Sequence, residues 1–251
     1  MGRVYLVGAG PGAADLLTLR AARLLATADV VLHDALVSEE VLALAPRAMK
    51  VAVGKRACRR STAQRFINKQ LVDAAGKYEV VVRLKGGDPM LFGRAEEELA
   101  ALEDAGIACE VVPGITAAFA ASAQLQTSLT RRGLARSVAF VTPRVGADES
   151  DSHWLDAAMG ADTAVLYMGG REIVEIARRL IAAGRPGSTP LAAVENASLP
   201  QERHWLGTLE TAAGLAASVD ASVAVLLLVG EVLRDCDAAQ AVTAVLEEQA
   251  A

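Results

Sequence analysis

The amino-acid sequence predicts an α/β protein of two domains, with a mainly parallel sheet in the first and a mixed sheet in the second. Short apolar runs alternate with helix-like segments in the first half, which is the pattern of a parallel sheet. Pro113 and Gly114 interrupt that alternation. Beyond them, strand-like runs at 191–195 and 204–209 have too short a link for a crossover helix, so this pair should be antiparallel. We therefore expect domains at 1–114 and 115–251.

The first domain is expected to contain five strands with helices between them. The helix after the first strand should be capped by Asp15, because apolar residues follow it at helical spacing. Ser38 and the two acids after it open a second helix, which Pro46 ends. Helices at 62–75 and 94–105 should stop at Gly76, in a left-handed cap, and at Gly106. The predicted strands are 4–7, 29–32, 50–53, 79–85 and 108–112.

The second domain is expected to be richer in strands than in helices. A helix of small residues at 115–123 begins it, one strong helix follows at 171–183, and a weaker one at 209–217. The residues after 235 suggest an Ala-rich helix. The predicted strands are 137–142, 163–168, 191–195, 204–209 and 222–229.

Composition limits the class of protein. Apolar residues make up 53% and charged residues 22% of the chain, as in globular proteins, which excludes disorder as the main state. The longest aliphatic run, 223–229, is too short to span a membrane, and the first residues lack the apolar segment of a signal peptide. Three scattered cysteines suit a reducing compartment. We therefore expect a cytoplasmic protein with no membrane partner.

The net charge of −5 conceals two basic segments that contain no acid. Residues 41–72 hold eight Lys and Arg, and residues 111–147 hold four Arg. If the two segments meet in space, they form a positive zone that concentrates an anionic ligand; if not, they are solvated loops. Phe66 is the lone aromatic residue of the first segment, which disfavours stacking on nucleic acid bases.

The first glycine-rich turn allows an alternative function. Gly8, Gly10 and Ala13 have the spacing of a dinucleotide-binding fingerprint between a strand and a helix, and Asp34 ends the next strand. This pattern alone favours an NAD-dependent oxidoreductase. Pro11 weakens that interpretation, because proline removes a backbone N–H where a phosphate needs donors.

Two more loops, at 85–94 and 112–117, follow strands of the first domain. Because the carboxyl ends of parallel strands share one edge, all three loops should lie together where ligands of open α/β sheets bind. The three histidines do not cluster with cysteine or other ligand residues at metal-binding spacing, so the sequence predicts no metal site.

Eight motifs occur in order along the chain, and together they resemble those of the tetrapyrrole methylases. The resemblance covers about 4–233 and does not rest on any single motif. The motifs are Val7-Gly-Ala-Gly-Pro-Gly12, Asp34-x-Leu-Val-Ser38, Gly54-Lys-Arg56, Arg83-Leu-Lys-Gly-Gly-Asp-Pro89, Phe92-Gly-Arg94, Val112-Pro-Gly-Ile-Thr116, Tyr167-Met-Gly169 and Val194-Glu-Asn196.

The resemblance implies the two-domain tetrapyrrole methylase fold, with a ligand cleft between the domains. Within the family, the chain is most similar to the members that methylate uroporphyrinogen III at two pyrrole carbons, C2 and C7, giving precorrin-2 by way of precorrin-1. The implied methyl donor is S-adenosyl-L-methionine, with S-adenosyl-L-homocysteine as its product. A homodimer and a place in sirohaem and cobalamin biosynthesis are also implied.

The resemblance also implies roles for individual residues. Asp34 and Lys55 match a proton acceptor and a proton donor. Arg94, counted as catalytic and as substrate-binding, pairs with Glu97 to engage or orient the substrate, while Arg56 and Arg131 neutralise its carboxylates. The methyl donor is placed against Pro11, Gly86, Gly87, Asp88, Leu91, Thr116, Ala117, Met168 and Ala197.

Other functions remain open at the level of sequence. The nearest alternative is a methyltransferase of a later precorrin. Outside the family stand the NAD-dependent oxidoreductase and a non-catalytic protein that binds a tetrapyrrole or nucleic acid. The expected partner is a small-molecule tetrapyrrole, with no nucleic acid.

Overall fold

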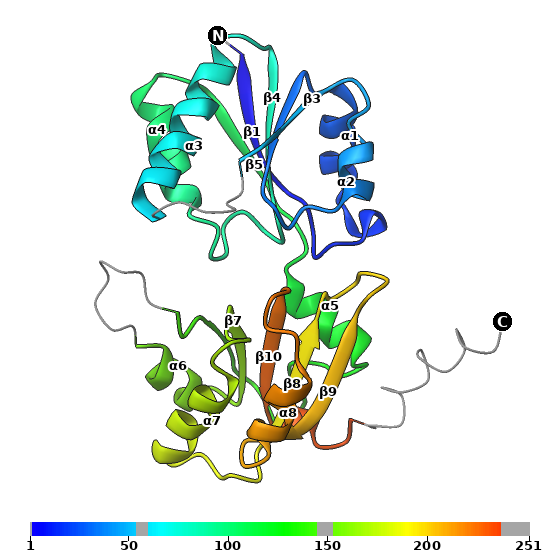
Figure 1. The fold of residues 1–251 in the computed structure, drawn as a ribbon, viewed down its shortest axis with the longest axis vertical. Helices are drawn as coiled ribbons and strands as arrows, with labels where there is room; N and C mark the ends of the chain where they lie inside the picture. Colours follow the sequence, from blue (N-terminus) through cyan, green and yellow to red (C-terminus); the bar gives the residue numbers. More distant parts are fainter. Residues whose placement is uncertain (1, 54–59, 145–152, 237–251) are drawn as a thin grey trace, which may run out of the picture. The chain divides into compact units, whose positions relative to one another are not determined.

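The computed structural model describes residues 2–53, 60–144 and 153–236, and the chain divides into two compact units (Figure 1). The units are Met1–Ala117 and Ala118–Ala251. The division falls close to the predicted boundary after residue 114. Each unit is built around its own five-stranded sheet.

The sheet of the first unit has the order β3-β2-β4-β1-β5 and is parallel throughout. Its central position belongs to β4, where Val7 of β1 lies beside Leu84 in the register. This arrangement confirms the parallel sheet predicted for the first half. The strands are β1 (Arg3–Gly8), β2 (Val30–His33), β3 (Met49–Ala52), β4 (Val80–Lys85) and β5 (Cys109–Val112).

Helices cover both faces of this sheet (Figure 1). On one face, α1 (Leu19–Thr27) and α2 (Glu39–Ala43) contribute Leu25 and Val41 to a buried cluster. On the other face, α3 (Arg60–Ala75) and α4 (Ala95–Asp104) contribute Leu71 and Leu102. The connections after β1 and β4 therefore leave the sheet toward opposite faces.

Two helix ends differ from the prediction. The side chain of Thr18, not Asp15, caps α1 by accepting a hydrogen bond from the Ala21 N–H. Asp15 lies in a separate 3-10 turn (Ala14–Leu16), and the extended backbone of Leu17 prevents a helix from passing through it. Ser38 caps α2 as predicted. Gly76 does not adopt the left-handed conformation predicted for it.

The second unit contains a mixed sheet of order β6-β7-β10-β8-β9, as predicted. The pair β6–β7 is parallel, and β10 runs antiparallel to both of its neighbours. The predicted antiparallel pairing of the strands near 191–195 and 204–209 is confirmed. The strands are β6 (Val138–Val141), β7 (Thr163–Tyr167), β8 (Pro190–Glu195), β9 (Arg203–Thr208) and β10 (Val225–Gly230).

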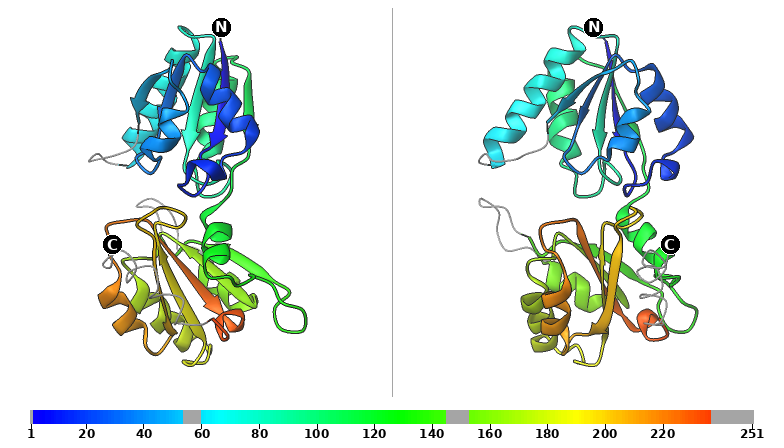
Figure 2. Two further views of the ribbon diagram at one scale, coloured as in Figure 1. Left: turned by 90° about the vertical axis from the view of Figure 1, so that its right-hand side faces the viewer. Right: turned by 45° about the vertical axis from the view of Figure 1, so that its right-hand side comes forward.

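Helices also pack on both faces of the second sheet (Figure 2). One face carries α6 (Trp154–Gly160), α7 (Ile173–Ala182) and α8 (Ala212–Ser218). The other carries α5 (Ala117–Gln124) and a short 3-10 turn, Glu231–Leu233. The sequence did not predict α6, because seven residues hold only one helical repeat of buried positions, Trp154 and Ala158.

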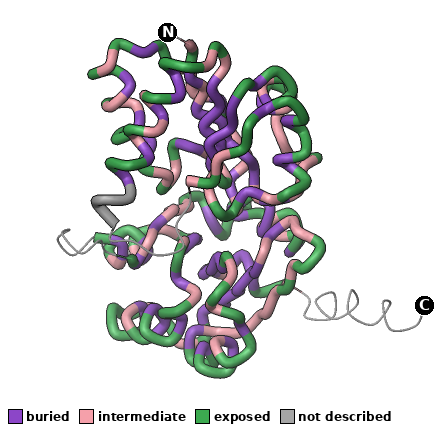
Figure 3. Tube along the Cα trace, turned by 45° about the horizontal axis from the view of Figure 1, so that its top comes forward, coloured by how far each residue is buried: buried purple, intermediate pink, exposed green. Residues whose placement is uncertain are grey.

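Burial is greatest in the inner strands of both sheets (Figure 3). All residues of β8 and β10 are buried, while the exposed residues concentrate on the helices and loops. Among the described residues, no helix is long and apolar enough to cross a membrane. The Ala-rich helix predicted after 235 lies almost wholly outside the described residues.

Candidate functional site

The loops that follow β1 and β4 meet at the carboxyl edge of the first sheet. The Gly10 N–H donates to the Gly87 carbonyl at 3.2 Å, and the Gly87 N–H donates to the Gly10 carbonyl at 2.7 Å. Since the connections after these two neighbouring strands leave toward opposite faces, their carboxyl ends form the switch point where open α/β sheets bind ligands. The mutual bonds leave neither N–H free for a phosphate, which argues against the dinucleotide-binding interpretation.

Asp88 joins the loop after β4 to the loop after β5. Its Oδ2 accepts a hydrogen bond from the Gly114 N–H at 2.9 Å, and its Oδ1 accepts one from the Met90 N–H at 2.8 Å. Sequence reasoning gave this carboxylate a direct role toward the ligand. In the structure it holds two backbone segments in place, which is a role that spacing alone does not reveal.

Close backbone packing explains two glycines at this edge. A Cβ on Gly8 would lie 2.6 Å from the Gly114 Cα, and a Cβ on Gly114 would collide with the Gly87 carbonyl oxygen. No side chain fits at either position without a shift of backbone. Gly8 and Gly114 therefore allow the three loops to approach one another.

Gly86 and Gly87 have space around them where a side chain would project. The φ of +68° at Gly87 disfavours any side chain, and the nearest atom to a Cβ there would be the Thr116 Cα at 3.9 Å. At Gly86, a Cβ would meet only Leu36 at 3.6 Å. Among the described residues, a Cβ at Gly86 or Gly87 would therefore meet only Leu36 or Thr116, at van der Waals distance. This is the arrangement expected where a ligand lies against the chain.

The other residues of the first unit that are predicted to contact the methyl donor lie on these same loops. Pro11 follows Gly10 directly, Leu91 belongs to the turn that Asp88 begins, and Ala117 opens α5. Thr116 is buried, with 7% of its surface exposed. The structure thus brings together seven of the nine predicted donor contacts: Pro11, Gly86, Gly87, Asp88, Leu91, Thr116 and Ala117.

The other two residues predicted to contact the methyl donor, Met168 and Ala197, lie in the second unit. Met168 follows β7 directly, and Ala197 lies two residues beyond the end of β8. Because both strands run antiparallel to β10, their carboxyl ends reach the same edge of the second sheet. Met168 is 46% exposed and Ala197 is buried.

Backbone strain concentrates at the predicted site. Six non-glycine residues among those described have a positive φ. Five of them lie in the predicted motifs or next to a predicted site residue: Phe92, Arg94, Met168, Asn196 and Ser198. Such conformations cost about 1–3 kcal/mol each and are retained mainly at functional sites. Three of these residues, Met168 and the two neighbours of Ala197, lie at the edge of the second sheet where the sequence predicts contacts with the methyl donor.

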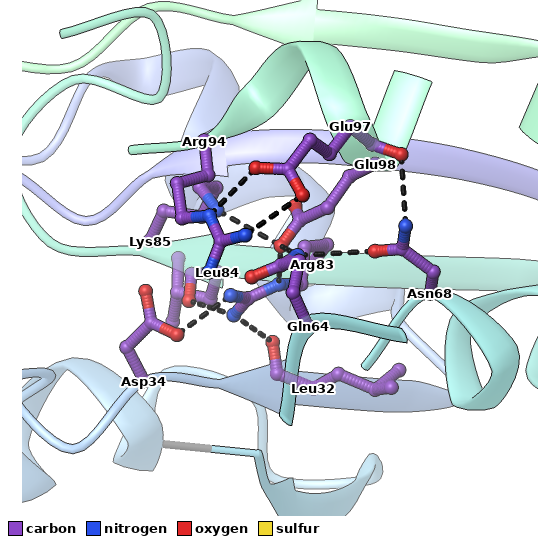
Figure 4. Close-up of polar contacts among 10 residues, drawn as sticks. All are labelled: Leu32, Asp34, Gln64, Asn68, Arg83, Leu84, Lys85, Arg94, Glu97 and Glu98. Carbon is purple, nitrogen blue, oxygen red and sulfur yellow. Dashed lines mark hydrogen bonds and ion pairs between the residues drawn. The ribbon is translucent and has the colours of Figure 1, made fainter. Parts of the chain in front are cut away.

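Arg94 and Glu97 form a bidentate ion pair at the start of α4 (Figure 4). The Arg94 Nε and Nη2 donate to the two Glu97 carboxylate oxygens at 2.6 and 2.8 Å. Both side chains are exposed by more than 40%. Because the guanidinium fork is occupied by Glu97, a substrate carboxylate must displace Glu97 to bind Arg94 in the same way.

A buried network of charges lies beneath the exposed pair (Figure 4). Arg83 of β4 donates to Asp34 Oδ1 at 2.6 Å and to Glu98 Oε1 at 3.1 Å. Lys85 donates to the same Glu98 oxygen at 3.0 Å. Burial, followed by the charge of Arg83, lowers the pKa of the Lys85 ammonium from its usual range.

Sequence reasoning identified Asp34 but assigned no role to Arg83, Lys85 or Glu98. A signal for two of them was present. Arg83 and Lys85 follow three consecutive valines in a strand of a parallel sheet, where both faces are covered and charge is rare. Glu98 gave no comparable signal, because helix α4 contains several acids and only the fold shows which one is buried.

Of the remaining predicted residues, one lies away from the other predicted residues of its unit, and two lie outside the described residues. Arg131 donates to Asp235 at 2.6 Å, and Asp235 follows the end of β10. Because β10 runs antiparallel to β7 and β8, Arg131 lies at the opposite edge of the second sheet from Met168 and Ala197. Lys55 and Arg56 lie outside the described residues. Within the described ranges, no three His, Cys, Asp or Glu side chains are grouped to hold a metal ion.

Comparison with known proteins adds independent evidence. Uroporphyrinogen-III C-methyltransferase from Paracoccus denitrificans (strain Pd 1222) is 46% identical over 234 residues, covering 92% of this chain and 82% of that protein. A siroheme synthase from Chromobacterium violaceum is 47% identical over 237 residues, covering 94% of this chain and 50% of that protein. The chain spans about half the length of the siroheme synthases that it matches.

A solved structure has the same fold. Uroporphyrin-III C-methyl transferase from Thermus thermophilus, complexed with S-adenyl homocysteine, superposes with a TM-score of 0.80 at 43% identity. The match covers 93% of this chain and 99% of that one. Residues 3–213 also match the family of Tetrapyrrole (Corrin/Porphyrin) Methylases. With its parallel first sheet, its mixed second sheet and this match over most of its length, the chain belongs to the tetrapyrrole methylases.

Proposed function

We propose that the chain transfers methyl groups from S-adenosyl-L-methionine to C2 and C7 of uroporphyrinogen III. The products are precorrin-2, formed by way of precorrin-1, and S-adenosyl-L-homocysteine. The observation that carries this proposal is the meeting of three strand-end loops around Gly10, Gly87 and Gly114. The relative from Paracoccus and the Thermus structure with S-adenyl homocysteine support both the substrate and the donor. The product would enter sirohaem and cobalamin biosynthesis.

The exposed backbone at Gly86 and Gly87 fits the methyl donor. A Cβ at Gly87 would occupy the open space beside Thr116, so glycine keeps this surface free for a ligand. When bound, the donor supplies an electrophilic methyl group on a sulfonium centre. The residues proposed to hold it are Pro11, Gly86, Gly87, Asp88, Leu91, Thr116, Ala117, Met168 and Ala197.

Asp34 is proposed to accept the proton that the methylated ring carbon releases. A reduced pyrrole carbon is enamine-like: it forms the new C–C bond, the S–C bond breaks, and the resulting cation must lose a proton. Arg83 holds Asp34 Oδ1, whereas Oδ2 has no hydrogen bond or ion pair within the described part of the chain. The Asp34 side chain is 31% exposed, and Oδ2 is therefore the oxygen proposed to accept the proton.

Arg94 is proposed to bind a carboxylate of the macrocycle. Its guanidinium already holds a carboxylate in fork geometry, that of Glu97, and it stands on the same loop as Gly87. Lys55 is proposed as a proton donor, and Arg56 as a further partner of the substrate carboxylates; Arg131, which pairs with Asp235 at the opposite edge of the second sheet, is not included. The abundance of basic residues in 41–72, with no acid among them, supports an anionic substrate.

The decisive experiment is anaerobic incubation of the purified protein with uroporphyrinogen III and labelled S-adenosyl-L-methionine. We expect label in a tetrapyrrole with the absorption spectrum of precorrin-2. Later precorrins are tested in parallel. Repeated failure with uroporphyrinogen III, beside an active control enzyme, would exclude the proposal, and methylation of a later precorrin alone would assign the chain to another reaction of the family.

A homodimer and a cytoplasmic location complete the proposal. Both follow from the family resemblance, and the free thiols of Cys109 and Cys236 are consistent with a reducing compartment. Sedimentation equilibrium of the purified protein tests the first point. A single species with the mass of one chain at micromolar concentration would contradict it.

A further inference from the structure

Arg83 is an almost completely buried charge near the proposed site. It lies on β4, the central strand of the first sheet, and its side chain is 2% exposed. A guanidinium in such a place must have its N–H groups satisfied, because an unpaired buried charge is strongly destabilising. The hydrogen-bond partners of Arg83 therefore indicate the role of its side chain.

Four contacts fix the orientation of the Arg83 guanidinium (Figure 4). Nη1 donates to the carbonyls of Leu32 at 3.4 Å and Leu84 at 3.1 Å. Nε donates to Glu98 Oε1 at 3.1 Å, and Nη2 donates to Asp34 Oδ1 at 2.6 Å. Three of these partners are themselves buried, so only the contact with Asp34 reaches toward solvent.

Glu98 anchors the buried end of this network. It is completely buried, and its Oε1 accepts hydrogen bonds from Arg83, Lys85 and Gln64. Its Oε2 is buried without a hydrogen-bond partner among the described residues. A carboxylate that gathers three donors on one oxygen holds Arg83 and Lys85 side by side, which two like charges would otherwise oppose. The direction of the Arg83 side chain thus depends on Glu98.

We propose that Arg83, anchored by Glu98, is a positioning residue that fixes the carboxylate of Asp34 for proton transfer. By holding Oδ1, Arg83 leaves Oδ2 as the accessible oxygen of a carboxylate that cannot turn freely. Charge-assisted hydrogen bonds of this length are strong and directional. This inference rests on the proposed function, because it assigns Arg83 a purpose in the proton transfer to Asp34.

Arg83→Lys is the principal test. Lysine keeps the positive charge but has no fork, so it cannot bond Glu98 and Asp34 in the present geometry. We expect kcat to fall about 10- to 100-fold, as for a misplaced reacting group. The KM for the tetrapyrrole and the Kd for S-adenosyl-L-homocysteine should stay within about twofold of wild type, since neither is proposed to touch Arg83.

A double-mutant cycle with Asp34→Asn separates positioning from a purely structural role. If Arg83 acts through Asp34, the double variant should be no slower than Asp34→Asn alone. If the loss of kcat in the double variant equals the product of the losses in the two single variants, the inference is overturned. A change in the KM of Arg83→Lys with kcat preserved would overturn it as well. A crystal structure of Arg83→Lys provides a readout besides activity. Asp34 should lose its fixed orientation there, and an unchanged carboxylate would likewise overturn the inference.

Glu98→Gln is the second variant, for use if Arg83→Lys does not fold. Glutamine is neutral, so it no longer offsets the adjacent charges of Arg83 and Lys85 and holds Arg83 less firmly; the same loss of kcat and the same cycle are expected. Glu110→Gln is the matched control: it removes a paired carboxylate from β5, where Glu110 bonds Arg3 and Arg20, and should leave kcat unchanged. Inactivity of the wild type itself would count against the proposed function, whereas an active wild type with an additive cycle would count against the inference alone.

Discussion

At the scale of single residues, the proposed site contains two ion pairs: the Asp34 carboxylate bonded by Arg83, and the Arg94 guanidinium bonded by Glu97. Arg83 fixes Asp34 from within the sheet, while Glu97 occupies Arg94 at the surface. The first arrangement is partly buried, with the Arg83 side chain 2% exposed and the Asp34 side chain 31% exposed. The second is exposed, where ion pairs contribute only about 0–1 kcal/mol, so a ligand can replace it.

Replacing Asp34 by asparagine tests the proposed proton acceptor. Asparagine keeps an oxygen for Arg83 but does not accept a proton at neutral pH, so kcat should fall about 10²- to 10⁴-fold. The Kd for S-adenosyl-L-homocysteine, measured by calorimetry, should not change. Asp104→Asn, at an exposed position near the end of α4, is the control. Wild-type turnover in Asp34→Asn would show that solvent takes the proton.

Replacing Arg94 by alanine tests substrate binding. We expect the KM for the tetrapyrrole to rise about tenfold, which corresponds to loss of one hydrogen-bonded charge pair. Glu97→Gln should have the opposite effect and lower that KM about two- to threefold, because it releases the Arg94 fork. Arg178 forms a similar exposed pair with Glu175 on α7, so Arg178→Ala is the matched control. An equal loss of donor affinity in Arg94→Ala would give Arg94 a structural role at its left-handed position.

At the scale of secondary-structure elements, strand ends determine where the loops meet. The carboxyl ends of β1, β4 and β5 lie side by side because these strands are neighbours in one parallel sheet. Gly8 and Gly114 then permit contact between backbones that any Cβ would separate. We therefore expect the arrangement of these loops to be sensitive to small steric changes at the strand ends.

Gly8→Ala tests this dependence. The added Cβ would lie 2.6 Å from the Gly114 Cα, so we expect a loss of about 1–3 kcal/mol in the free energy of unfolding, together with weaker donor binding. Denaturant titration measures the first effect and calorimetry the second. Gly214→Ala on α8 adds a Cβ with no atom within 4 Å, and should stabilise the protein by up to about 1 kcal/mol. Equal stability of the two variants would refute the steric argument.

At the scale of the whole molecule, each unit has the residues proposed to hold the methyl donor at the carboxyl ends of its strands. In the first sheet these are the loops around Gly87, and in the second they are Met168 and the residues around Ala197. The rest of each sheet is enclosed by helices on both faces. Binding is therefore expected to stabilise the folded chain without changing its core.

The choice of cofactor can be read from thermal stability. S-adenosyl-L-homocysteine at about 100 times its Kd should add roughly 2.7 kcal/mol to the free energy of unfolding and raise Tm. NAD should leave Tm unchanged at the same concentration, because Gly10 and Gly87 use their N–H groups on each other. A rise in Tm with NAD, and none with S-adenosyl-L-homocysteine, would instead support the interpretation of the first turn as a dinucleotide-binding site.

The sequence by itself determined the order of the strands, the parallel and mixed sheets, and the position of the loops that follow β1, β4 and β5. These features depend on local spacing: apolar runs, the Ser38 cap and glycines after strands are visible within a few residues. It failed where a local signal was ambiguous, as at Asp15, which resembles a cap although Thr18 serves as one.

Only the tertiary structure decided which charges meet. Asp34 and Glu98 are 49 and 15 residues from Arg83 along the chain, and they reach it because β2 lies beside β4 while α4 packs on the same sheet. Strand order and helix packing depend on the burial of apolar surface over the whole unit, and no local pattern encodes them. A carboxylate becomes an anchor or a proton acceptor according to its depth in the fold, and that depth is a property of the assembled sheet and helices.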